Sequence, residues 1–192
     1  RLHYFASLAS FSPEPRLRAK YKITQRLRLQ AGAGLYSQNL LTTRSTRDVV
    51  NLFTGFISSP ENTSGPAIED PIQRGNHLLT GIQYDLLEGL TLNFEVYRKG
   101  FPQLVNVNPV QVFPSDPEFI EQKGKAIGFD LFGDFRKGRW SGRFGYGWAK
   151  STRQLGGITY APAFDRRHNL NALLAYSLGT RKQWQLSARW NF

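Results

Sequence analysis

The sequence predicts an all-β protein, and more specifically an antiparallel transmembrane β-barrel of which these residues form an incomplete set of about nine strands. Apolar and polar residues alternate with period two along most of the chain, as in strands whose two faces meet different surroundings. Aromatic residues make up 14% of the sequence, and many lie near the ends of the alternating segments. The connections between these segments are short and long in turn, as in outer-membrane barrels.

Eight segments carry the alternation, with mainly apolar residues on one face and many charged and small polar residues on the other. In the first segment, Leu17, Ala19 and Tyr21 lie on one face while basic residues occupy the other. The N-terminal stretch RLHYFASLASF is predicted as a ninth strand, although its pattern does not define which face is apolar. In order, the eight segments are RLRAKYKIT, QRLRLQAGAGLYS, HLLTGIQYDLL, GLTLNFEVYRK, KAIGFDLFGDF, RWSGRFGYGWAK, NLNALLAYSL and QLSARWNF.

Alternation alone would also suit a soluble β-sandwich, so two further features are needed to favour the membrane. One is the position of the aromatic residues, which resembles the girdles at the two bilayer interfaces. They lie beside short turns at Tyr84, Phe135, Trp140, Tyr176 and Trp184, and toward the opposite ends at Trp148, Trp190 and Phe192. The other is the asymmetry of the connections, which are short at 24–25, 86–89, 136–139 and 179–182 and long at 38–75, 100–123 and 152–166.

The number and direction of the strands predict that the chain is a piece of a larger barrel domain spanning 1–192 and beyond. Bacterial barrels keep both ends on the short-turn side, which requires an even strand number. Counted from the turn at 179–182, the last strand runs away from that side and ends at Phe192. Nine strands are also an odd number. A portion of a roughly 22-stranded barrel therefore fits better than a complete small one.

The charge is strongly basic, with a formal net charge of +11 at pH 7. Nucleic-acid binding would need exposed cations with stacking aromatic residues beside them, but here the aromatic residues alternate onto the opposite face. We therefore expect no nucleic-acid partner. A basic stripe facing the barrel lumen could attract anionic ligands, or it could form ion pairs with a domain inside the barrel or be hydrated. The stripe consists of Arg16, Arg18, Lys20, Lys22, Arg26 and Arg28.

Four stretches, in this order, resemble hairpins of the TonB-dependent receptors, the outer-membrane active transporters of Gram-negative bacteria, and especially those of Bacteroidota. They are SPEPRLRAKYKITQRLRLQAGAGLYSQ, NHLLTGIQYDLLEGLTLNFEVYRKGFPQL, KGKAIGFDLFGDFRKGRWSGRFGYGWAKS and FDRRHNLNALLAYSLGTRKQWQLSARWNF. The resemblance implies a barrel in the cell outer membrane that imports a scarce ligand, energised through TonB. Ferric chelators, vitamins such as cobalamin, glycans and peptides all stay open as ligands. A passive porin or a structural barrel protein is the alternative.

The resemblance also implies partners: outer-membrane lipid, the TonB complex through a plug domain that this sequence lacks, and a surface lipoprotein or other membrane-complex subunits. Ligand contacts are expected in the outer loops or at the rim, because long loops on a rigid scaffold often carry function. Ordinary loop packing is the alternative role for the same residues. The candidates are Tyr36, Phe53, Phe56, Phe101, Gln103, Asn106, Asn108 and Phe113.

No enzymatic or metal-binding motif is legible, so we expect no catalytic residue, no metal and no cofactor. His3, His77 and His168 are far apart and share no metal-ligand spacing. An outer-membrane hydrolase would need a Ser-His-Asp group at the rim, where only Asp165 and His168 lie near each other in the sequence. A loop-to-strand cap is the preferred explanation of that pair.

Overall fold

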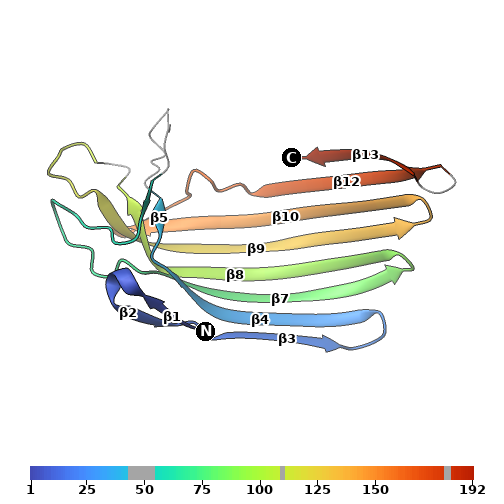
Figure 1. The fold of residues 1–192 in the computed structure, drawn as a ribbon, viewed down its shortest axis with the longest axis horizontal. Helices are drawn as coiled ribbons and strands as arrows, with labels where there is room; N and C mark the ends of the chain where they lie inside the picture. Colours follow the sequence, from blue (N-terminus) through green and yellow to red (C-terminus); the bar gives the residue numbers. More distant parts are fainter. Residues whose placement is uncertain (43–54, 109–110, 180–182) are drawn as a thin grey trace.

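The computed structural model describes residues 1–42, 55–108, 111–179 and 183–192. An antiparallel nine-stranded sheet forms a single open layer, in the order β13-β12-β10-β9-β8-β7-β4-β3, with β11 paired to β10 (Figure 1). Two small two-stranded sheets, β1-β2 and β5-β6, lie apart from it. The bounds of the main strands are β3 Arg16–Lys22, β4 Leu27–Gln38, β7 Gln73–Leu87, β8 Leu90–Val107, β9 Phe119–Lys137, β10 Trp140–Leu155, β11 Ile158–Tyr160, β12 His168–Leu178 and β13 Trp184–Asn191.

The eight long strands coincide with the eight alternating segments, which confirms an all-β fold with a large antiparallel sheet. The register aligns the apolar positions across the sheet. Phe94 on β8 lies opposite Ile82 on β7 and Leu131 on β9, and Leu131 lies opposite Tyr146 on β10. Because side chains alternate along a strand, this register gives the sheet one apolar face and one polar face.

The prediction of a ninth long strand at the N-terminus is wrong. Residues 2–13 fold back on themselves as β1 (Leu2–Phe5), a short 3₁₀ helix η1 (Ala6–Leu8) and β2 (Ser10–Pro13). Ala9 takes a left-handed backbone conformation with φ of 45°, which reverses the chain after η1. The turn lets β2 satisfy the hydrogen bonds of β1 locally.

Among the described residues, no helix is long and apolar enough to cross a membrane.

The strands also extend further than the alternation indicated, so the predicted long connections are too long. β8 and β9 stay paired from Leu90 opposite Phe135 as far as Val107 opposite Phe119, across a register shift between Phe101 and Leu104. Backbone hydrogen bonds hold this extension, and they do not depend on apolar alternation. As a result Phe101, Gln103 and Asn106 lie on a strand and not in a loop.

The short and long connections lie at opposite ends of the sheet (Figure 1). The tight turns 23–26, 88–89 and 138–139 occupy one end, called the turn end here, and β12 joins β13 there too. The other end, called the loop end, carries β5 (Leu41–Thr42), β6 (Phe56–Ile57) and the described parts of the longer connections. Gly89 shows why the turns need glycine. Its φ is +81°, and a Cβ there would collide with the carbonyl oxygen of Arg136.

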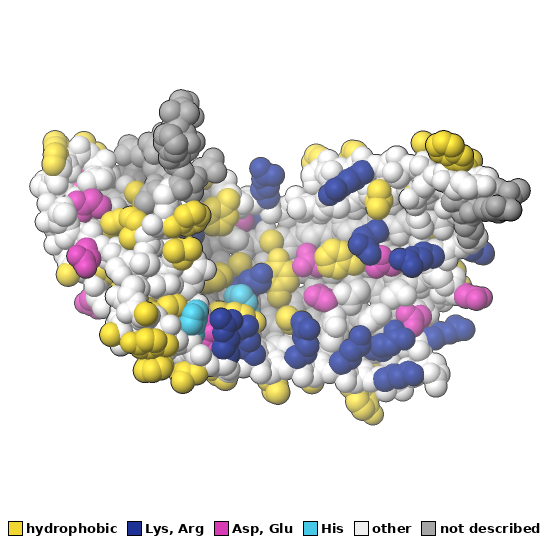
Figure 2. Space-filling view, viewed as in Figure 1, with side chains coloured by type: hydrophobic (Ala, Val, Ile, Leu, Met, Phe, Trp, Pro, Cys, Tyr) yellow, Lys and Arg dark blue, Asp and Glu magenta, His cyan; other side chains and the backbone are white. Residues whose placement is uncertain are grey.

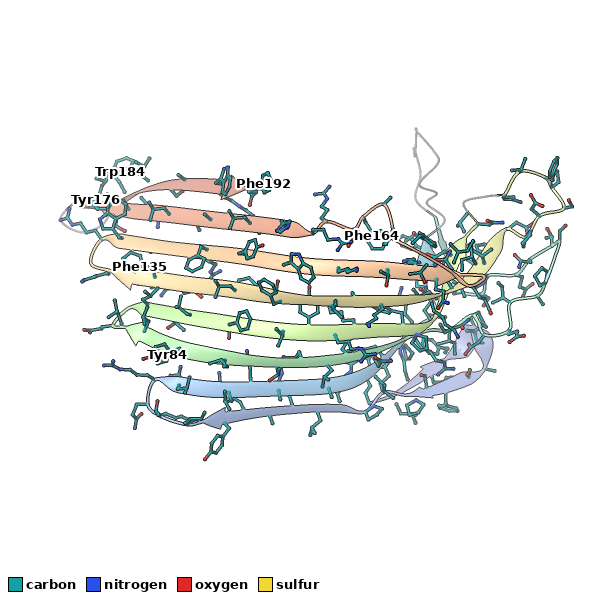
Figure 3. The ribbon with its side chains drawn as sticks, turned by 180° about the vertical axis from the view of Figure 1, so that it is seen from behind. Tyr84, Phe135, Phe164, Tyr176, Trp184 and Phe192 are labelled. Carbon is teal, nitrogen blue, oxygen red and sulfur yellow. The ribbon has the colours of Figure 1, made fainter. Side chains whose placement is uncertain are left out.

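Apolar burial is concentrated at the loop end, beneath the connections. Phe5, Leu41, Ile72 and Val105 are all buried there, whereas Ala175 is a buried small residue within the sheet. The apolar face of the main sheet has no second layer packed on it within the described part of the chain. Figure 3 looks onto this face from behind, with Tyr84, Phe135, Tyr176 and Trp184 near the turn end.

Candidate ligand-binding site

The polar face of the sheet carries Lys, Arg, Asp and Glu side chains, as the alternation predicts. Figure 2 looks onto this face and shows Lys and Arg side chains gathered over β3 and β4, with acidic side chains nearer the middle. Glu95 on β8 and Asp130 on β9 lie opposite each other in the register. Gln30 donates a hydrogen bond of 2.6 Å to Glu95, and Asn93 donates one of 2.8 Å. Hydrogen-bonded polar side chains therefore cross the centre of this face.

The basic stripe follows β3 and the start of β4, and neighbouring strands neutralise part of it. Arg28 forms an ion pair of 2.8 Å with Asp85 on β7. Lys20 donates a hydrogen bond of 3.0 Å to the Oε1 atom of Gln83. Within the described residues, no carboxylate lies within 4.0 Å of the charged atoms of Arg18 or Lys20. The stripe therefore keeps uncompensated positive charge on the polar face.

Four side chains stack in sequence across the loop end of this face, and we call them the rim cluster. The Arg16 guanidinium lies 4.2 Å above the ring centre of Tyr36, a cation–π arrangement. Tyr36 stacks on His77 with ring centres 4.3 Å apart. His77 in turn meets Phe101 edge to face at 6.0 Å. The four residues come from β3, β4, β7 and β8, which are consecutive in the sheet.

Glycines make room for the rim cluster. A Cβ added at Gly34 would lie 3.1 Å from Cε2 of Tyr36, and one at Gly75 would lie 3.3 Å from Cδ1 of Phe101. Both contacts are tighter than a Cβ ordinarily makes, so the aromatic rings depend on the bare backbone beneath them. The cluster is thus a built feature of the sheet, and it holds aromatic surface in a fixed orientation.

Beside the rim cluster lies a cavity of about 280 Å³, called the rim pocket here. Arg153 on β10 donates a hydrogen bond of 3.2 Å to Gln122 and lies 5.4 Å from the ring centre of Phe164. The lining of the rim pocket contains cationic and aromatic residues and no Asp or Glu, which suits a ligand with an anionic group attached to an apolar body. The lining residues are Lys99, Phe101, Leu104, Gly124, Lys125, Ala126, Ser151, Thr152, Arg153, Pro162 and Phe164.

Glu14 fixes one end of the rim cluster. Its side chain is 2% exposed, forms an ion pair of 2.7 Å with Arg16, and accepts hydrogen bonds from the N–H and Oγ of Ser37. Burial alone would raise the pKa of Glu14, but the Ser37 hydrogen bonds and the charges of Arg16 and Arg1 outweigh it and lower that pKa. An ionised Glu14 therefore holds Arg16 over Tyr36.

The structure brings two of the predicted site residues together and separates the others. Tyr36 and Phe101 join through His77 in the rim cluster. Gln103 donates to the carbonyl oxygen of Asp70 at 3.0 Å, a contact that braces a connection.

The remaining candidates lie away from the cluster. Asn108 is 8% exposed and donates to the carbonyl oxygen of Pro117 at 2.8 Å. The Asn106 amide nitrogen is buried and has no hydrogen-bond partner among the described residues. Phe56 and Phe113 are exposed side chains at the loop end, and Phe53 lies outside the described residues.

Sequence reasoning missed His77, Lys99, Arg153 and Phe164 as candidate ligand contacts. The sequence alone suggests His77 only as a metal ligand, and one histidine does not make a metal site. Pairing the two hairpins in register would have placed it opposite Gly34, next to Tyr36. Phe164 lies in a connection, so no alternation pattern could indicate which face of the sheet it approaches.

Asp165 and His168 each contact other residues in the described part of the chain. Asp165 accepts a hydrogen bond from the N–H of Ser151 and forms an ion pair of 2.8 Å with Arg167. His168 shares a hydrogen bond of 2.8 Å between its Nδ1 and the hydroxyl of Tyr146. In the part of the chain that the structure describes, no three His, Cys, Asp or Glu residues are grouped to hold a metal ion.

No family model, no curated protein and no solved structure matches this chain. The candidate site is an aromatic and basic cluster beside a cation-lined pocket, at the loop end of the polar face.

Proposed function

We propose that the sheet is part of a transmembrane barrel in the outer membrane, with lipid against its apolar face. One observation carries the proposal: among the described residues no second layer covers the apolar face, and its large side chains are exposed. Phe94 is 42% exposed, Leu174 48% and Leu186 67%. A water-soluble sheet buries such a face against a second layer. A membrane strand turns it to lipid, where exposure of apolar groups costs nothing.

The dimensions of the apolar face support a bilayer-spanning sheet. On β9, this face carries five successive uncharged residues from Ile127 to Phe135, with Lys125 before them and Lys137 after them. Eight steps of about 3.4 Å give about 27 Å along the strand, or about 21 Å across the membrane at a tilt of about 40°. That height is close to the apolar band of about 25 Å in outer-membrane barrels.

Within that barrel, the chain acts as a TonB-dependent active transporter. The resemblance of the four hairpins supports this role, together with the separation of short turns from long connections and the polar face that would line a lumen. The edges of β3 and β13 have no partner strand among the described residues, and further strands would pair with them to close the barrel.

The rim cluster and rim pocket are the proposed ligand contacts, since they lie at the loop end, where ligand would arrive. The ligand binds outside and passes to the periplasm when TonB drives a plug domain to rearrange. No bond of the ligand is made or broken, so the proposal includes no catalytic residue.

Conductance in a planar lipid bilayer tests this function against a passive porin. The full native chain is purified from outer membranes and inserted into the bilayer. A plugged transporter gives no steady conductance, whereas a porin gives stable open channels. Recovery of the protein outside the outer-membrane fraction would contradict the membrane proposal itself, and steady open channels would contradict the transporter and favour the porin.

A further inference from the structure

A row of basic side chains borders the apolar face on its loop side. The last apolar row crosses the sheet as Val96, Phe129 and Trp148, which are opposite one another on β8, β9 and β10. In the next row, Arg98 and Lys150 flank Ile127. One row further on, Lys125 takes the same face between Gly100 and Thr152. We call Arg98, Lys125 and Lys150 the basic belt.

The belt belongs to the apolar face and not to the polar one. Arg98 lies opposite Leu78 of β7 and two residues beyond Val96, so the alternation of β8 gives it the apolar side. Lys150 follows Trp148 by two residues in the same way. The Arg153 side chain of the rim pocket lies on the opposite face of these strands, where it contacts Gln122. Lys125 also lines the rim pocket, but Arg98 and Lys150 do not, so the basic belt extends beyond the ligand-binding site.

The belt charges are exposed, and none of them has an ion-pair partner among the described residues. Arg98, Lys125 and Lys150 are all exposed side chains. Over the described ranges of the chain, no carboxylate lies within 4.0 Å of their charged atoms. The nearby Asp165 is 6% exposed and already paired with Arg167. Neighbouring strands are about 4.8 Å apart, so β8 and β10 hold their two cations about 10 Å apart with the third between them.

The row below the belt marks the edge of the apolar region. Trp148 stacks on Phe129 at 6.0 Å, and the Tyr146 hydroxyl bonds to His168, which lies opposite Trp148. Rings with an apolar body and a polar tip favour the level of the lipid headgroups. Lys and Arg side chains just beyond that level extend their charged ends into the headgroup region.

We infer that the basic belt binds phosphate groups of the membrane lipid on the loop side of the bilayer. This inference rests on the proposed membrane location but not on transport. Phosphates carry the charge that three clustered cations would neutralise, and each cation near a charged lipid surface adds to the attraction. On the loop side, an outer membrane contains lipid A, a glycolipid with two phosphates. The belt therefore anchors a phosphorylated lipid beside β8, β9 and β10.

Lipid binding by two matched triple variants tests the inference. The belt variant is Arg98→Gln, Lys125→Gln and Lys150→Gln. The control is Arg18→Gln, Lys20→Gln and Lys22→Gln, which removes the same charge from the polar face. The full native chain is purified from membranes in an uncharged detergent, and binding of lipid A is measured by native mass spectrometry. Dephosphorylated lipid A and inorganic phosphate serve as the other probes.

The belt variant should bind lipid A at least about tenfold more weakly than the unchanged protein, while the control stays within about twofold. Dephosphorylated lipid A should bind the unchanged protein and the belt variant equally weakly. Equal binding of lipid A by the belt variant and the unchanged protein would overturn the inference. So would inorganic phosphate that displaces lipid A at equal concentration, because the site would then recognise a free anion. Failure of the unchanged protein to fractionate with membranes would instead contradict the proposed location.

Discussion

The loop end and the body of the sheet follow opposite rules of burial. At the loop end, Ile72 is 2% exposed and Val105 0%, so apolar side chains lie inside as in a protein folded in water. In the body of the sheet, large apolar side chains such as Leu186 lie on the outer surface. The contrast occurs within single strands. On β8, Val105 is fully buried beneath the connections, while Phe94 is 42% exposed.

Under the proposed membrane location, this difference arises because one strand passes from lipid into water. Composition averages the two regions, so a mean hydropathy of −0.42 describes neither of them. The position at which burial reverses lies close to the basic belt, which is where the proposed bilayer ends. Four sets of substitutions test this difference in burial, and they follow in order of decreasing expected effect.

Ile72→Ala should have the largest effect, because it removes a fully enclosed side chain from the loop-end core. We expect a loss of about 2–5 kcal/mol in the free energy of unfolding. Phe113→Ala, at an exposed position of the same end, should change it by less than about 0.5 kcal/mol. Urea titration of the protein reconstituted in liposomes measures both. Equal costs for the two variants would mean that the loop end has no packed core.

Phe94→Arg places a charge at the middle of the apolar face. If that face meets lipid, the expected cost is about 2–4 kcal/mol in the free energy of unfolding from liposomes. Ser187→Arg adds the same side chain to the polar face and should cost little, because that position is exposed on the polar face. A near-zero cost for Phe94→Arg would show that water, not lipid, covers this face.

Glu14→Gln tests the charged anchor of the rim cluster. The lost ion pair and weakened hydrogen bonds should cost about 1–3 kcal/mol at neutral pH. Because the folded-state pKa of Glu14 is lowered, its contribution is fully present above the ordinary glutamate pKa of about 4.5 and is lost as pH falls through the folded value. Unfolding titrations from pH 7 to pH 3 should show the difference between variant and unchanged protein shrinking. A difference independent of pH would contradict an ionised Glu14.

Gly89→Ala and Gly138→Ala compare two turns at the turn end of the sheet. Both glycines have positive φ, so each alanine costs about 1–2 kcal/mol of backbone strain. Only Gly89 adds a clash, with the carbonyl oxygen of Arg136; a Cβ at Gly138 would meet no described atom within 4 Å. The Gly89 variant should therefore be the less stable in the same urea titration. The reverse order would mean that the β7–β8 turn rearranges.

Periodicity predicted the body of the sheet well, because lipid or core on one face forces alternation at every second residue. It failed where that constraint ends. Residues 2–13 form a hairpin whose direction depends on the backbone of Ala9, and β8 continues through Phe101 and Asn106 on backbone pairing alone. The rim cluster was half predicted: Tyr36 and Phe101 were named, but His77 became visible only with the register. Burial of Glu14 depends on long-range contacts with Ser37, which no local pattern encodes.

The proposed membrane location requires that the apolar face of the sheet meets lipid. The chain contains no cysteine, so single cysteines can carry nitroxide labels without further substitutions. Labels placed one at a time at residues 91–96 of β8, in the protein reconstituted in liposomes, would report collision with oxygen, which concentrates in lipid, and with a water-soluble nickel chelate. If lipid covers the apolar face, collision with oxygen should be favoured at residues 92, 94 and 96, and collision with the nickel chelate at residues 91, 93 and 95. Access of the nickel chelate to both sets of positions would contradict it.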